Sequence, residues 1–123
     1  MGTHKKILIV DDDMIALDIV DFLFEDHGYE VIRSSDGHSA LESVEELSPD
    51  IILIDLMMPK MSGQDCIVAL REKGVTVPIV AFTAIDDPEV HAAVEVAGGT
   101  LVLTKPCKPS RLLEEIESLL DLS

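Results

Sequence analysis

Short apolar runs alternate along the chain with longer stretches in which apolar and polar residues are mixed. Four runs, at residues 7–10, 51–54, 79–83 and 101–104, consist almost entirely of aliphatic side chains. Runs of this length bounded by turn-forming residues are typical of strands that are buried on both faces. A half-polar run at 30–34 predicts a further strand at the edge of the same sheet.

Each predicted strand is followed by a stretch with the apolar spacing of an amphipathic helix. Helix starts are predicted at residues that commonly cap helices: Asp13, Asp36, Ser62 and Asp87. In the first helix the spacing predicts a buried stripe of Ile15, Ile19, Phe22 and Leu23. Strands that alternate with helices through short connections indicate an α/β fold, with a parallel sheet and helices on both faces.

The stretch 51–63 contains a candidate functional residue at the end of a predicted strand. The apolar run ends in Asp55, and a loop that contains Pro59 and Gly63 follows. Asp55 is therefore expected at the carboxyl end of a central strand, which is the edge where open α/β sheets bind their ligands. The simpler alternative is that Asp55 only caps the loop.

Composition narrows the class of protein. A chain of 123 residues is expected to form one domain, with residues 6–123 folded and residues 1–5 as a tail that is partly tag-derived. The aromatic content of 3% predicts an aliphatic core. No apolar run is long enough to span a bilayer, and no signal peptide opens the chain. Cys66 and Cys107 have neither metal-ligand nor disulfide spacing, which favours reduced thiols and a cytoplasmic location.

The formal net charge of −15 changes the expected partners. Binding to nucleic acid or to anionic membranes depends on lysine and arginine neutralising phosphates. We therefore expect that this domain binds neither directly. The simpler alternative, that the acidity only maintains solubility, accounts for much of the charge.

The carboxyl ends of parallel strands point to the same edge of a sheet, so the residues that follow the strands are expected to meet. These residues are Asp11 and Asp12, Asp55, Thr83 and Lys105. Clustered carboxylates repel one another, and a divalent cation relieves the repulsion. Mg²⁺ prefers one or two carboxylates together with phosphoryl oxygens, so the set predicts a site for phosphoryl transfer to a carboxylate.

At these positions the sequence resembles the receiver domains of two-component response regulators, over essentially its whole length. The matching segments are 10–12 (VDD), 55–63 (DLMMPKMSG), 83–84 (TA) and 103–106 (LTKP). The resemblance implies a flavodoxin-like (βα)₅ fold with strand order 2-1-3-4-5. It also implies a signalling domain that catalyses only its own phosphorylation and dephosphorylation.

Carried over by position, the resemblance makes Asp55 the acceptor of a phosphoryl group from a phosphohistidine. Asp11, Asp12, Asp55 and the Met57 carbonyl would hold Mg²⁺, with Mn²⁺ as a substitute. Thr83 and Lys105 would contact phosphoryl oxygens together with the Met57 and Ala84 amides. The Lys105–Pro106 peptide bond would be cis. One departure is Val102, which stands where relatives often carry the aromatic partner of the threonine.

The resemblance also implies partners. The phosphoryl donor would be a histidine kinase or a histidine phosphotransfer protein, and the output would reach a protein target or an attached output domain. The responding surface, and a dimer contact, would lie on residues 87–120. Whether the chain stands alone or is part of a larger regulator stays open.

Two other functions compete with this interpretation. A phosphatase of the haloacid-dehalogenase type would use Asp11 as its nucleophile, although Ile15 stands where that motif carries threonine. A receiver-like binding module that is never phosphorylated is the second alternative. The aspartate that becomes labelled distinguishes the first, and the absence of labelling distinguishes the second.

Overall fold

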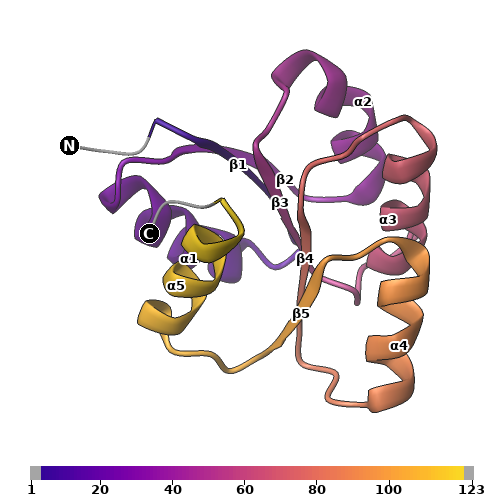
Figure 1. Ribbon diagram of the computed structural model, residues 1–123. Helices are drawn as coiled ribbons and strands as arrows, with labels where there is room; N and C mark the ends of the chain where they lie inside the picture. Colours follow the sequence, from indigo (N-terminus) through magenta and orange to yellow (C-terminus); the bar gives the residue numbers. More distant parts are fainter. Residues whose placement is uncertain (1–3, 121–123) are drawn as a thin grey trace.

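The computed structural model describes residues 4–120, in which strands and helices alternate strictly (Figure 1). The strands are β1 (Lys6–Val10), β2 (Glu30–Ser34), β3 (Ile51–Ile54), β4 (Ile79–Thr83) and β5 (Leu101–Thr104). The helices are α1 (Met14–Asp26), α2 (Gly37–Leu47), α3 (Gly63–Glu72), α4 (Pro88–Ala97) and α5 (Pro109–Leu119). Every predicted strand is present, within one residue of its apolar run.

The five strands form one parallel sheet in the order β2-β1-β3-β4-β5, as the sequence predicted. Every residue of β3 is buried, which explains its continuous run of aliphatic side chains. The half-polar β2 lies at one edge of the sheet, and β5 lies at the other. Of the helices that the structure describes, none is both long and apolar enough to cross a membrane.

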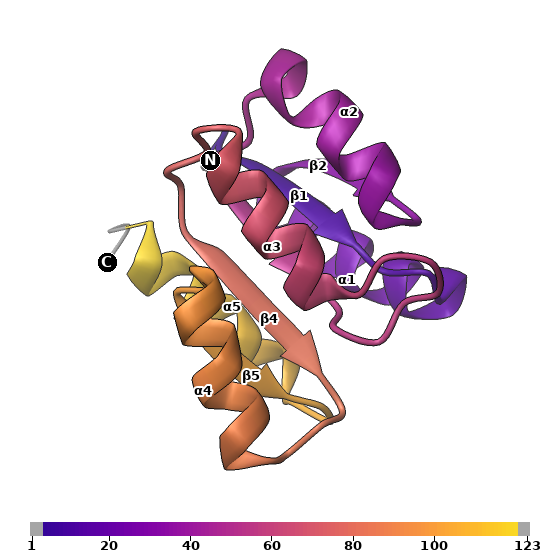
Figure 2. The same cartoon turned by 90° about the vertical axis from the view of Figure 1, so that its right-hand side faces the viewer.

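Helices cover both faces of the sheet. In Figure 1 the sheet is seen nearly edge-on, with α1 and α5 on one side and α2, α3 and α4 on the other. Figure 2 shows the second of these layers from the front. A hydrophobic core lies on each face of the sheet, and successive residues of a strand point alternately into the two cores. Ile7 and Ile9 pack beneath α1 and α5, whereas Leu8 and Val10 pack beneath α2 and α3.

The predicted helix starts are confirmed. Asp13, Asp36, Ser62 and Asp87 each accept a hydrogen bond from a backbone N–H in the first turn of the following helix. The predicted cis peptide bond between Lys105 and Pro106 is also present. Residues 1–3 of the predicted tail lie outside the described residues, while the Lys5 carbonyl already accepts a hydrogen bond from Glu30 N–H.

The predicted buried face of α1 is wrong. Ile15, Ile19 and Phe22 are exposed by 72%, 63% and 72%, and Leu23 is only partly buried. The buried side chains of this helix are instead Leu17, Val20 and Phe24. Both sets have helical spacing, so α1 is apolar on more than its core-facing side. The side chains of Ile15, Ile19 and Phe22 therefore form an apolar surface on α1 that is exposed to solvent.

Two phenylalanines in α1 provide a direct check of this orientation. Phe24→Ala should lower the free energy of unfolding by about 3–5 kcal/mol, because Phe24 is fully buried and packs edge-on against Tyr29 at 5.0 Å between ring centroids. Phe22→Ala should change it by less than about 0.5 kcal/mol. Urea denaturation of the two variants measures both values, and equal losses would contradict the assigned face.

Candidate functional site

Three carboxylates meet where β1 and β3 end. Asp11 and Asp12 follow β1, Asp55 follows β3, and each offers an oxygen such that the three atoms lie within 4.8 Å of one another. Asp11 is buried, Asp55 is partly buried and Asp12 is exposed. The sequence predicted that these acids would meet at one edge of the sheet. We call the three of them the acidic rim, or carboxylate rim; its members range from buried to solvent-exposed.

Backbone hydrogen bonds continue from the sheet into this rim. Asp55 N–H donates to the Val10 carbonyl at 2.9 Å, and Asp11 N–H donates to the Ser34 carbonyl at 3.1 Å. One side-chain oxygen of Asp11 accepts the Asp13 N–H at 2.9 Å. The relative position of the acids therefore depends on the pairing of the strands rather than on flexible loops.

The loop after β3 holds the backbone of Asp55 in place. Gly63 N–H donates to the Leu56 carbonyl at 3.0 Å. A Cβ atom at Gly63 would lie 2.2 Å from the Asp55 carbonyl oxygen, so only glycine fits this approach. Met57 N–H donates to Asp55 Oδ1 at 3.2 Å, while the Met57 side chain is exposed.

The ammonium group of Lys105 lies among the acids. Lys105 Nζ is 3.1 Å from Asp11 Oδ2 and 3.7 Å from Asp55 Oδ2. Its backbone N–H donates to the Thr83 carbonyl at 2.7 Å, which fixes the start of the β5–α5 connection against β4. Lys105 therefore compensates part of the negative charge that the strand termini bring together.

Thr83 lies at the end of β4 and is fully buried. Its hydroxyl oxygen accepts a hydrogen bond from Ile85 N–H at 3.2 Å. Ala84, between these two residues, is exposed. The β4 terminus thus contributes a hydroxyl and an accessible backbone segment to the same edge of the sheet.

The electrostatic state of Asp55 reflects its burial. Desolvation raises the pKa of Asp55 above its ordinary value, and the charges of Asp11 and Asp12 raise it further. The Met57 amide and the Lys105 ammonium act in the opposite direction without cancelling the rise. Burial is therefore a larger cause of the raised pKa than the repulsion among the clustered carboxylates.

One neighbour of the site was not predicted from the sequence. Lys105 Nζ lies 5.1 Å from the ring centroid of Phe82, which is within the range of a cation–π contact. The sequence marked Phe82 only as part of an apolar strand. Spacing alone gives no signal for this contact, because it depends on the path of the lysine side chain across β4.

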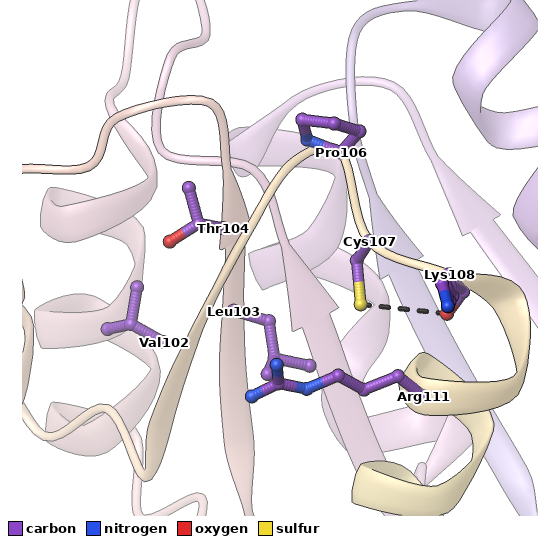
Figure 3. Close-up of a pocket in the computed structure, with 7 residues that line it drawn as sticks. All are labelled: Val102, Leu103, Thr104, Pro106, Cys107, Lys108 and Arg111. Carbon is purple, nitrogen blue, oxygen red and sulfur yellow. Dashed lines mark hydrogen bonds between the residues drawn. The ribbon is translucent and has the colours of Figure 1, made fainter.

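A separate groove lies beyond the site, along the outer edge of β5 and beside the start of α5. Its volume is about 470 Å³, and Figure 3 shows the Arg111 side chain extending along it toward β5. Val102 lines this groove, at the position where the sequence lacked the expected aromatic residue. The acids do not line it, so the groove is distinct from the carboxylate rim.

The sequence matches the family model described as "Response regulator receiver domain" over residues 7–117. The chain belongs to the response regulator receiver domain family. This confirms the resemblance that the four segments around the rim indicated.

Curated relatives of this receiver domain are longer regulators. It is 33% identical over 95% of its length to the alkaline phosphatase synthesis transcriptional regulatory protein PhoP of Bacillus subtilis, of which it covers 49%. It is 36% identical over 94% of its length to the DNA-binding response regulator MtrA of Mycobacterium tuberculosis, of which it covers 50%. The chain spans about half the length of these relatives.

Solved receiver-like structures are covered almost completely. The chemotaxis protein CheY4 of Vibrio cholerae superposes with a TM-score of 0.91 at 31% identity, over 95% of this chain and 99% of that one. A CheY-like receiver domain protein of Methanospirillum hungatei gives a TM-score of 0.89 at 30% identity, over 97% and 95%. The receiver domain therefore has the flavodoxin-like fold of these proteins.

The raised pKa of Asp55 predicts how stability depends on pH. The folded receiver domain holds a proton on Asp55 more readily than the unfolded chain does, so ionisation costs stability as the pH rises from 3.8 through the raised pKa. Asp55→Asn, which cannot ionise, should be more stable than the wild type at pH 7 in the absence of divalent cations. Denaturation at a series of pH values should show this advantage disappearing toward acid. An advantage that grew as the pH fell would contradict the assignment.

Proposed function

We propose that this receiver domain accepts a phosphoryl group on Asp55 from a phosphohistidine, and that the modification alters a partner-binding surface. The observation that carries this proposal is the contact of one ammonium with two acids, at 3.1 Å from Asp11 and 3.7 Å from Asp55. A cation held beside a partly buried carboxylate is suited to charge that develops on transferring phosphoryl oxygens. Membership of the receiver family supports the same chemistry.

The acidic rim fits a divalent cation. Asp11, Asp12 and Asp55 supply hard oxygen ligands within 4.8 Å of one another, and Asp12 is open to solvent, where the ion would keep water ligands. The Met57 carbonyl is the proposed backbone ligand. Mg²⁺, or Mn²⁺ in its place, would supply charge neutralisation for the acids and the phosphoryl oxygens. Without such a cation, the repulsion among the acids opposes the approach of an anionic donor.

In the proposed reaction, Asp55 is the nucleophile and other residues of the site bind the phosphoryl oxygens. A carboxylate oxygen of Asp55 attacks phosphorus as the P–N bond to the imidazole breaks, and the bonding electrons leave with the imidazole nitrogen, which is then protonated. Lys105 stabilises charge on the phosphoryl oxygens, and Thr83 and the amides of Met57 and Ala84 donate hydrogen bonds to them. The product is an acyl phosphate on Asp55.

The competing use of Asp11 as the nucleophile has less support. Asp11 is 6% exposed, one of its oxygens accepts the Asp13 N–H, and the other accepts Lys105. Asp55 retains a larger exposed fraction of its side chain, 14% against 8% for Asp11. The proposed acceptor is therefore the more accessible of the two acids beside the same lysine.

The proposed output surface consists of α4, β5 and α5. It adjoins the site directly, because Thr83 leads into α4 and Lys105 leads into α5. The groove in Figure 3 crosses this surface and is bordered by the cations Lys108 and Arg111. A protein target, an attached output domain or a second copy of the chain would bind here. The net charge still argues against direct contact with nucleic acid, and the reduced thiols favour a cytoplasmic setting.

Incubation with acetyl phosphate and Mg²⁺ tests the chemistry. The wild type should gain the mass of one phosphoryl group, which alkali then removes, because an acyl phosphate is labile in base. Asp55→Asn should gain nothing. Asp13→Asn is the matched control, since Asp13 is an exposed N-cap at the edge of the rim and should leave the gain intact. Labelling that persisted in Asp55→Asn would contradict the proposal and point to Asp11.

The exposed face of α1 is the proposed docking surface for the phosphoryl donor. Met14, Ile15, Ile19 and Phe22 are all more than half exposed, and Met14 begins the helix directly after the acidic rim. The patch continues into an apolar groove of about 320 Å³ between α1 and α5. A continuous exposed apolar surface of this kind marks a protein interaction site. A phosphohistidine-bearing protein must contact the surroundings of Asp55, and the α1 patch, together with the exposed Met57 side chain, supplies apolar surface there.

Substitutions on this face should separate docking from chemistry. Ile19→Ser combined with Phe22→Ser should lower the rate of phosphoryl transfer from a phosphohistidine protein by tenfold or more, since each side chain contributes about 1 kcal/mol or more to such contacts. The rate with acetyl phosphate should stay unchanged, because the rim is intact. Val96→Ser, at a 90% exposed position on α4, serves as the control. Equal losses with both donors would contradict a docking role.

A further inference from the structure

The ammonium of Lys105 has a third neighbour besides its two acids. The Phe82 ring lies 5.1 Å from Nζ, and the lysine side chain is 25% exposed. Lysine has a flexible four-carbon stem and a single compact charge, so its position depends on what surrounds the ammonium. Here the surroundings are carboxylates on one side and an aromatic face on the other.

The surrounding packing keeps Phe82 at this position. It is the residue before Thr83 in β4, and it pairs with Leu103 of β5 in the sheet register. Its side chain packs with the core beneath α1 and α5 and lines the apolar groove next to Phe22, Cys107 and Leu112. The ring thus forms a wall between that groove and the carboxylate rim.

Adjacent residues of β4 point to opposite faces of the sheet. Thr83 is fully buried at the strand end, whereas Phe82 remains partly exposed under the lysine. Two consecutive residues of one strand therefore approach the site from different sides. Of these two residues, only Thr83 was among the candidate site residues that the sequence analysis identified.

We propose that Phe82 is a positioning residue for phosphoryl transfer, whose ring face holds the Lys105 ammonium beside Asp11 and Asp55. The inference rests on the proposed phosphorylation of Asp55. Phe82 touches neither the metal ligands nor the phosphoryl group in this scheme and acts through Lys105 alone. In the absence of the ring, the ammonium samples more solvent-directed positions and spends less time at the rim.

Two variants separate this role from simple packing. Phe82→Leu keeps an apolar side chain on the groove wall but removes the aromatic face. It should slow phosphorylation by acetyl phosphate and Mg²⁺ roughly three- to fivefold, in keeping with a partly exposed cation–π contact. Phe82→Tyr keeps the face and should retain the wild-type rate. A loss of rate in both variants would indicate that only the shape of phenylalanine matters and would overturn the inference.

A double-mutant cycle with Lys105→Ala supplies the decisive comparison. Phe82→Leu should have no further effect on the rate once the lysine is absent, because the two residues act as one unit. Equal rate losses from Phe82→Leu in the presence and absence of Lys105 would overturn the inference while leaving the phosphorylation chemistry in place. Failure of the chemistry itself would appear separately, as labelling that survives in Asp55→Asn.

A measurement on the wild type guards against variants that do not fold. The ring current of Phe82 should shift the NMR signals of the Lys105 ε-methylene protons upfield, and Lys108, which is exposed, provides the unshifted reference. Coincident ε-methylene shifts for the two lysines would show that the contact does not exist in solution. Such a result would overturn the inference whatever the variants do.

Discussion

Pairing between β1 and β3 is the constraint on which the site depends. These central strands run in parallel with Val10 opposite Ile54, so the next residue of each strand is an aspartate at the same edge of the sheet. The hydrogen bond from Asp55 N–H to the Val10 carbonyl locks this register beyond the last paired residues. A slip of one residue would turn Asp55 toward the opposite face and separate it from Asp11 and Asp12.

The aliphatic core is what makes this electrostatically unfavourable arrangement tolerable. Each fully buried leucine, isoleucine or valine contributes on the order of 1.5–3 kcal/mol, and the strands that carry the acids consist almost entirely of such residues. Against this background the repulsion among the acids is a local cost, and Lys105 offsets part of it. A cation at the rim, or a change of charge on Asp55, would therefore act on a local cluster of like charges that rests on a well-packed sheet.

Much of the fold was predictable because short apolar runs and capping residues carry local signals. The runs at 7–10, 51–54, 79–83 and 101–104 are short, aliphatic and bounded by turn-forming residues, which favours buried strands. Their order along the chain predicted that the acids, Thr83 and Lys105 meet at one edge. The face of α1 was not predictable in the same way. Its apolar residues satisfy helical spacing on two different sides, and the choice between Phe22 and Phe24 depends on how the helix lies against Tyr29.

The roles proposed for Phe82 and for the α1 patch could not be predicted from the sequence, and the physical reason is the same for both. An apolar residue in a strand or helix is normally explained by the core, so nothing in its type distinguishes a core position from a functional one. Only the three-dimensional structure places Phe82 beneath a lysine, and Ile15 and Phe22 away from the core. Charged and hydroxyl residues at strand ends are the opposite case, because their burial costs energy and so demands an explanation.

These two apolar features also meet in space. Phe22 and Phe82 line the same groove between α1 and α5, and Phe82 forms the side of the groove that faces Lys105. A partner side chain seated on α1 would therefore contact the ring that lies against the ammonium. If a phosphoryl donor docks on α1 as proposed, its docking and the position of Lys105 are linked through one aromatic side chain. The proposed donor surface and the ring beside Lys105 thus lie in a single layer of packed residues, on the side of the sheet opposite the helices α2, α3 and α4.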